Sequence, residues 1–216
     1  MLHHLLQVWF GWVQQWGYWG VFLLMAMESS ILPVPSEVVM PPAAYWAAQG
    51  QMNFWGVVLA GTAGSYFGSV VSYFGAQALG LPLVKRYGKY FLLTEDKILM
   101  AEKWVVRYGI GGVFVARLLP VVRHLISIPA GVFRMRFASF SGVTIAGAFI
   151  WCVVLSWFGQ KVIGGHPELL NSPEEMVMVI KSQLKWFIGG VVLLGVLYGF
   201  VVRFKNTSQV ALPPGA

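Results

Sequence analysis

The sequence contains very little charge. Only 11% of its 216 residues are Asp, Glu, Lys or Arg, against roughly a quarter in soluble domains. Within the first 84 residues the charged side chains are Glu28 and Glu37 alone. A soluble domain of this size needs a far more charged surface, so the composition excludes an ordinary soluble protein. It predicts an all-α integral membrane protein with a single domain.

Cysteine is almost absent as well, and the single Cys152 excludes an intramolecular disulfide. The N-terminus lacks a basic region followed by a small-residue cleavage site, so no secretory signal is predicted. The basic residues that give the net charge of +7 lie between apolar segments. Membrane topology accounts for such a distribution, so we expect no nucleic-acid partner. His3, His4 and His166 have no ligand-like partners, so no metal or other cofactor is predicted.

Uncharged runs are long enough to cross a hydrocarbon core of about 30 Å, which needs roughly 20 apolar residues. We expect crossing helices over residues 54–80, 137–160 and 184–205. The basic residues within 85–107 predict an amphipathic surface helix on the cytoplasmic side. The remaining expected segments are an interfacial or spanning helix at 1–16, a polar loop at 163–183 and a disordered tail at 206–216.

Two proline-rich segments predict re-entrant hairpins, because proline interrupts a helix and broken backbone is tolerated in a membrane only inside protein or a wet cavity. The first covers 17–50 and the second covers 108–135. Basic residues after the last crossing predict a cytoplasmic C-terminus, which gives the hairpins opposite orientations. The pattern predicts an inverted repeat with a site near the midplane, although the side of the N-terminus stays open. The expected breaks lie at Pro33, Pro35, Pro120 and Pro129.

Small residues recur at every fourth position of the first expected crossing, at Gly56, Ala60, Gly64, Gly68, Ser72, Ala76 and Gly80. Such a stripe lets a second helix approach closely. It serves either a contact inside the chain or a contact between copies in a homo-oligomer.

Four charges lie inside the expected hairpins: Glu28 and Glu37 in the first, and Arg117 and Arg123 in the second. A charge at the centre of a membrane helix costs about 2.5–3.5 kcal/mol, so such residues pair or face a cavity. The matched numbers predict that the hairpins meet through these side chains. Arginine binds phosphate bidentately, and a carboxylate in a dry site can exchange protons. The arginines therefore suit phosphate binding, and the acids suit gating or proton coupling.

Other interpretations of these residues are open. The four charges also suit a static buried network that only holds the hairpins together, and Glu37 and Arg123 suit positions near water at the hairpin mouths. His124, beside Arg123, is either a proton relay or a polar residue of the cavity or interface.

Two motifs carry a family resemblance. The stretch from Glu28 to Glu37 reads ESSILPVPSE, and the stretch from Phe114 to Arg123 reads FVARLLPVVR, followed by PAG and Met135. Both resemble motifs of the DedA (VTT-domain) family, in the family order, over about residues 15–162. Family members often carry Gly-Asp in the helix after the first hairpin, where this chain has Gly68-Ser69. Ser69 is thus at most an accessory residue, and proton coupling would depend on Glu28 and Glu37.

The resemblance implies two opposed re-entrant hairpins among the helices of a bacterial cytoplasmic (inner) membrane protein. It also implies a flippase that returns undecaprenyl phosphate or a similar lipid phosphate across the membrane. Alternatives are a broad phospholipid scramblase, a proton-coupled ion or solute transporter, and a lipid phosphatase. No enzyme is expected, because the sequence offers no nucleophile with a base at useful spacing.

Overall fold

The structure, a computed structural model, describes residues 2–30, 34–87, 108–119, 123 and 125–165, with six single positions between 178 and 196. Every regular element in these ranges is helical, which confirms the predicted all-α class. The labelled helices are α1 (Leu2–Trp16), α2 (Tyr18–Glu28), α3 (Ser36–Ala48), α4 (Phe54–Tyr87), α6 (Ser127–Val132) and α7 (Phe137–Gly165). Residues 108–117 form a further helical stretch.

Several expected segments lie largely or wholly outside the described residues. They are the amphipathic helix at 85–107, the polar loop at 163–183, the last crossing at 184–205 and the tail at 206–216.

The two long helices extend past the ends expected from the sequence. Helix α4 continues beyond Gly80 to Tyr87, and α7 continues beyond Gln160 to Gly165. Glycine does not end α4, since membrane helices tolerate such residues where their surroundings satisfy the backbone. Within them, Phe54–Ala78 and Phe137–Lys161 are long and apolar enough to cross a membrane.

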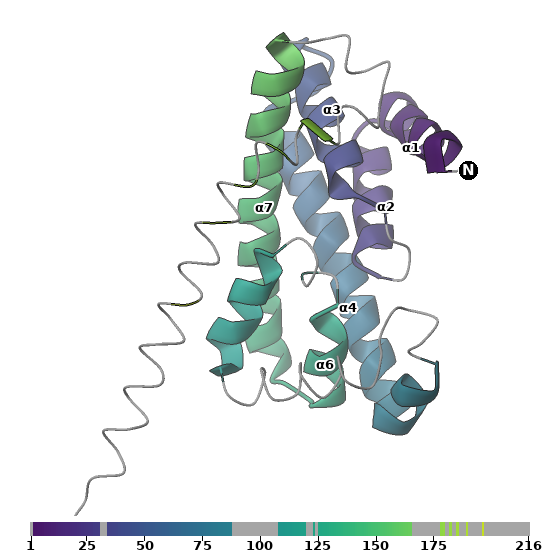
Figure 1. The fold of residues 1–216 in the computed structure, drawn as a ribbon, viewed down its shortest axis with the longest axis vertical. Coiled ribbons are helices and arrows are strands. Elements are labelled where there is room, and N and C mark those ends of the chain that lie inside the picture. Colours follow the sequence, from purple (N-terminus) through teal and green to yellow (C-terminus); the bar gives the residue numbers. More distant parts are fainter. Residues whose placement is uncertain are drawn as a thin grey trace, which may run out of the picture.

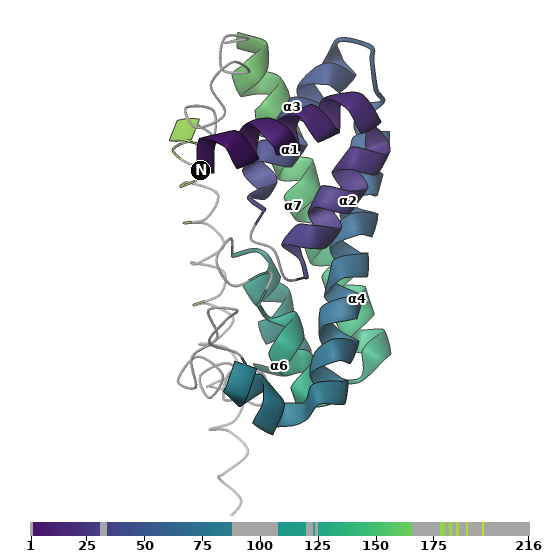
Figure 2. The ribbon, with the colours of Figure 1, turned by 90° about the vertical axis from the view of Figure 1, so that its right-hand side faces the viewer.

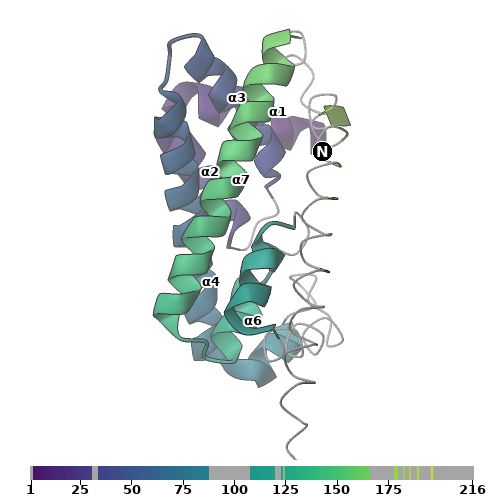
Figure 3. The same cartoon turned by 90° about the vertical axis from the view of Figure 1, so that its left-hand side faces the viewer.

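The helices form a bundle along α4 and α7, which run its whole length (Figure 1). Helix α2 packs along α4, α3 packs against α7, and α6 packs against α4. Helices α3 and α6 lie toward opposite ends of the bundle (Figures 1 and 3). Helix α1 crosses the α3 end at a steep angle to α4 (Figure 2).

The turn between α1 and α2 depends on Gly17. Its φ of 54° lies in the left-handed region that favours glycine, and its N–H donates to the Val13 carbonyl at 3.1 Å. This geometry ends α1 and redirects the chain into α2. Asn53 caps the start of α4, because its Oδ1 atom accepts the Trp55 N–H at 2.9 Å and the Gly56 N–H at 3.2 Å.

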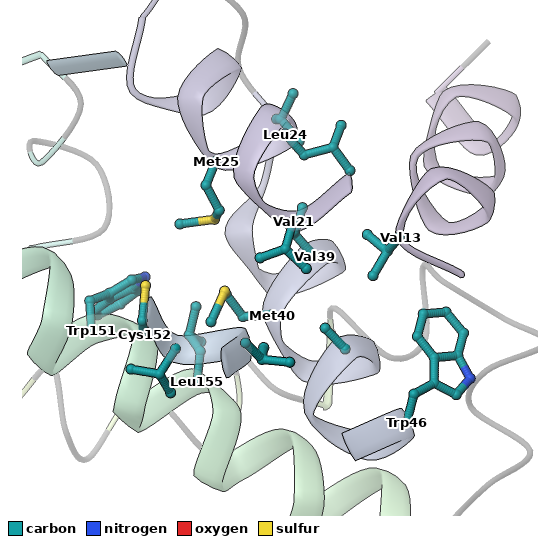
Figure 4. Packing of buried hydrophobic residues seen from close by; sticks show 14 of the residues in the cluster. Val13, Val21, Leu24, Met25, Val39, Met40, Trp46, Trp151, Cys152 and Leu155 are labelled. Atoms are coloured by element: carbon teal, nitrogen blue, oxygen red, sulfur yellow. The ribbon is translucent and has the colours of Figure 1, made fainter. Parts of the chain in front are cut away.

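The main apolar core lies where α1, α2, α3 and α7 meet (Figure 4). Its fully buried members include Val21 and Met25 from α2, Met40 from α3, and Trp151 and Leu155 from α7. Between membrane helices the driving force is close packing more than removal from water. This core therefore fixes the end of α2 and the start of α3 relative to α7.

The small-residue stripe of α4 makes a contact inside the chain. A Cβ atom on Gly64 would lie 2.2 Å from the Phe22 carbonyl oxygen, and one on Gly68 would lie 2.1 Å from that of Ala26. Both carbonyls belong to α2, so the glycines allow the two backbones to touch. This face of α4 is occupied by α2 and is not free for a second copy.

We expect Gly64→Ala to destabilise the protein by about 1–3 kcal/mol, because the added methyl group must push α2 away from α4. Gly75→Ala is the matched control, since nothing lies within 4 Å of a Cβ atom there and alanine is the better helix former. Thermal unfolding in detergent should show a lower midpoint for the first variant only. Equal midpoints would contradict the proposed close contact.

Candidate functional site

The four charges singled out from the sequence are all buried. Glu28 is 8% exposed, Glu37 7%, Arg117 3% and Arg123 5%. The alternative in which Glu37 and Arg123 lie near water at the hairpin mouths is disfavoured by this low exposure, because packed helices enclose both side chains. A buried charge needs a partner, so the contacts of each one define the candidate site.

Glu28 and Arg123 form a buried ion pair. Glu28 is the last residue of α2, where the partial negative charge of the helix end disfavours a carboxylate. The Nη2 atom of Arg123 donates to Glu28 Oε2 across 95 residues of sequence. Within the described part of the chain this is the one ion pair between side chains. It joins the end of α2 to the segment before α6.

Serines fix the chain just after Glu28. Ser29 Oγ lies 2.8 Å from Ser65 Oγ on α4. Ser72, about two turns further along the same face of α4, donates to the Ser29 carbonyl at 3.1 Å. Carbonyls at a helix end lack intrahelical donors, so α4 supplies one from a side chain. These bonds hold the Glu28 carboxylate at a defined position beside α4.

The Arg123 guanidinium also contacts α7. Its Cζ atom lies 5.1 Å from the centre of the Trp151 ring, which is a cation–π arrangement. Trp151 Nε1 in turn donates to Ser36 Oγ at 3.2 Å. The ion pair is therefore connected to the first residue of α3 through the indole of α7.

Glu37 lies in the first turn of α3, where the partial positive charge of the helix start favours a carboxylate. Pro35 caps this helix in an extended conformation. Glu37 interacts electrostatically with Glu28. Among the described residues, the structure brings neither arginine within ion-pair distance of Glu37.

Arg117 lies at the end of the helical stretch 108–117 and is bound by neutral groups. Its Nη1 atom donates to Ser69 Oγ at 2.8 Å and its Nη2 atom donates to Ser127 Oγ at 2.7 Å. Its Cζ atom lies 5.6 Å from the centre of the Phe140 ring. A Cβ atom on Gly147 would lie 2.7 Å from the Arg117 Cβ atom, so this glycine of α7 makes room for the arginine.

Sequence reasoning missed several residues that hold the arginines. They are Ser127, Phe140, Gly147 and Trp151, which the structure brings together from α6 and α7. The sequence marked Ser69 only as an accessory position. A serine or aromatic residue in an apolar run gives no signal of its own, because such residues occur throughout membrane helices.

Of the expected hairpin breaks, Pro35 precedes α3 and Pro129 lies buried in the first turn of α6. A proline fits the first turn because the helix does not use its N–H there. Pro33, Pro120 and His124 lie outside the described residues.

Sequence comparison identifies the family. The family model of the VTT domain matches residues 34–161, which include Glu37, Ser69 and both buried arginines. The chain belongs to the VTT-domain (DedA) family. No solved structure gives a significant match.

Three relatives of this chain show which named proteins it is similar to. Undecaprenyl phosphate transporter A of Bacillus subtilis is 36% identical over 151 residues, which cover 70% of this chain and 74% of the relative. The protein of the same name from Staphylococcus aureus is 26% identical over 89% of this chain and 92% of the relative. An alkaline phosphatase-like protein of Lactococcus lactis is 32% identical over 91% of this chain and 94% of the relative. With its two apolar helices, the chain is a bacterial membrane protein of the VTT-domain family.

Proposed function

We propose that this protein is a flippase that moves undecaprenyl phosphate, or a similar polyprenyl or lipid phosphate, across the cytoplasmic membrane for recycling of the carrier lipid. The observation that carries the proposal is the pair of buried arginines, Arg117 and Arg123, among membrane-capable helices. Guanidinium groups bind phosphate oxygens bidentately and stay charged at any working pH. The names of two relatives support the same substrate class.

The architecture we infer is an inverted repeat of two re-entrant hairpins. Helices α2 and α3 precede α4, and the stretch 108–117 and α6 precede α7. The second arm of each hairpin packs against the long helix of the other half: α3 against α7, and α6 against α4. Each half therefore packs its second hairpin arm against the long helix of the other half. A pseudo-two-fold axis in the membrane plane that relates the two halves would produce this packing. The basic C-terminal residues favour a cytoplasmic C-terminus in the inner membrane.

In the proposed cycle, Glu28 controls whether Arg123 is available. A charged Glu28 holds Arg123 in the ion pair. Proton uptake by Glu28 would release Arg123 toward the phosphate, with Glu37 as a second carboxylate near Glu28. Movement of the hairpins would then expose the site on the other side, while the prenyl tail stays in lipid. Proton transfer and phosphate transport are coupled through this competition for Arg123.

The test uses vesicles that contain undecaprenyl phosphate in both leaflets. A phosphatase added outside hydrolyses only the outer-leaflet lipid unless the protein exchanges it. We expect the purified protein to raise the hydrolysed fraction well above that of protein-free vesicles. A fluorescent phosphatidylcholine serves as the control lipid. A bleaching reagent added outside should destroy only its outer-leaflet fluorescence, and the inner-leaflet fluorescence should stay protected.

Each alternative predicts another result. Loss of protection for phosphatidylcholine would support a broad scramblase. Release of inorganic phosphate without added phosphatase would support a lipid phosphatase. If the polyprenyl phosphate behaves as it does in protein-free vesicles, the flippase proposal fails and an ion or solute transporter becomes the better account.

A further inference from the structure

Two consecutive prolines inside α3 leave backbone acceptors without donors. Pro41 and Pro42 lie within this helix, and proline has no N–H to donate to the carbonyl four residues earlier. The carbonyls of Glu37 and Val38 therefore lack the bond that an unbroken helix would give them. Both residues are buried, so these carbonyls need another donor. We call the two prolines and the two carbonyls the proline break of α3.

The Glu37 carbonyl lies on the face of α3 that contacts α7. Gly159 of α7 touches the backbone of Pro41, since a Cβ atom on this glycine would lie 2.4 Å from the Pro41 Cα atom. Next along α7, Gln160 Nε2 donates to the Ala44 carbonyl at 3.3 Å. Residues 37, 41 and 44 share one face of a helix. The acceptor that Pro41 leaves without a donor is therefore turned toward α7.

Ser156 of α7 lies at the level of the proline break. Near the start of α3, Trp151 Nε1 donates to Ser36 Oγ at 3.2 Å. Further along both helices, Gly159 touches Pro41, so α3 and α7 run in the same direction here. Ser156 falls between these two contacts and shares a face of α7 with Gly159, three residues on.

The Ser156 hydroxyl has no hydrogen-bond partner among the described residues, although its side chain is fully buried. A buried hydroxyl in a helix can donate to the carbonyl four residues earlier, as Thr62 of α4 does to Val58 at 2.7 Å. Ser156 makes no such bond. A buried donor and a buried acceptor at the same level, without a direct bond between them, are typical partners of a bridging water.

We infer that a buried water occupies the proline break and bridges the Glu37 carbonyl to the Ser156 hydroxyl, so that α3 bends here against α7. Prolines and inserted waters are common causes of a sharp bend in a helix, and ordered waters satisfy freed backbone groups in membrane helices. A bridge through water tolerates changes in distance that a direct bond does not. The break therefore lets the second arm of the first hairpin flex during the hairpin movement of the proposed function, on which this role rests.

A double-mutant cycle in thermal stability tests the water, on the full chain in detergent. In wild type, Ser156→Ala removes one partner of the water, and we expect a midpoint lower by about 2–4 °C. Pro41→Ala restores an N–H for the Glu37 carbonyl. In that background Ser156→Ala removes only an unpartnered hydroxyl, so the midpoint should stay the same or rise.

Pro42→Ala is the matched control. The carbonyl that it supplies with an N–H is that of Val38, which is turned about 100° from that of Glu37. In this background Ser156→Ala should still lower the midpoint. Equal effects of Ser156→Ala in wild type and in Pro41→Ala would overturn the bridge, and so would a higher midpoint in wild type.

A second comparison decides if Pro41→Ala does not fold. Ser156→Thr keeps the hydroxyl and should unfold at the wild-type midpoint, whereas Ser156→Ala should unfold at a lower one. Equal midpoints of these two variants would overturn the bridge.

Exchange of undecaprenyl phosphate in the vesicle assay tests the bending. Pro41→Ala replaces the water bridge by a direct bond within α3, so we expect exchange at least about threefold slower than wild type, with a midpoint at or above wild type. Exchange at the wild-type rate would overturn the role of the break in the movement. Absence of exchange by wild type would overturn the proposed function itself, whereas the water bridge stands or falls with the stability cycle.

Discussion

Replacing Arg117 by methionine should abolish transport of the lipid phosphate and weaken its binding by about a hundredfold or more. The loss follows from two charge-assisted hydrogen bonds to phosphate, at about 1.5–3 kcal/mol each, where about 1.4 kcal/mol is tenfold. Methionine keeps an apolar stem that can pack against Phe140. The vesicle assay measures transport, and binding of undecaprenyl phosphate to the full chain in detergent micelles measures the affinity.

The fold should survive the substitution of Arg117 by methionine. Loss of binding and transport without loss of stability would show that Arg117 acts on the substrate. Arg117 has only neutral partners among the described residues, so removing its charge strands no buried carboxylate and relieves a desolvation cost. We expect a thermal midpoint at or above that of wild type. Arg136→Met, at an exposed arginine near the start of α7, is the control and should keep both transport and stability. A large loss of stability in Arg117→Met with binding intact would make Arg117 a structural residue.

Breaking the ion pair between Glu28 and Arg123 should give the opposite pattern of stability. Glu28→Gln leaves a buried guanidinium without its partner, and Arg123→Met leaves a buried carboxylate. Each single variant should lose about 3–5 kcal/mol of folding free energy. The double variant removes both charges, so we expect it to regain most of that loss. Unfolding of all four proteins in detergent closes the double-mutant cycle.

Transport distinguishes a working pair from a static one. If Glu28 releases Arg123 during the cycle, the double variant should be stable and still inactive. If the pair only holds the hairpins together, restoring stability should restore transport as well. The second result would favour the static buried network and leave Arg117 as the sole arginine on the phosphate.

The sequence predicted which charges matter, but not how they pair. Glu28, Glu37, Arg117 and Arg123 stand out because charge inside apolar segments is costly, whatever the detailed fold. Any pairing of two acids with two arginines satisfies the same charge count. The choice of Arg123 for Glu28 depends on how segments 95 residues apart pack, and one sequence carries no record of that distance.

The contacts of Arg117 were beyond prediction for a related reason. Ser69 and Ser127 are ordinary small polar residues in apolar helices, and only the approach of α6 to α4 brings them to one guanidinium. Gly131 permits that approach, since a Cβ atom there would lie 2.1 Å from the Tyr73 carbonyl oxygen. The glycine stripe of α4, by contrast, was visible in the sequence because it repeats at helical spacing.

Cys152 gives the unmodified protein its own probe of opening. It is the single cysteine of the chain, its side chain is fully buried on α7, and it follows Trp151, whose ring contacts Arg123. A water-soluble alkylating reagent can reach this thiol only during moments when α3 or α4 separates from α7. The alkylation rate therefore reports on the population of the open form when reclosing is faster than alkylation, and a change in that rate on adding lipid would follow the transport cycle without any engineered label.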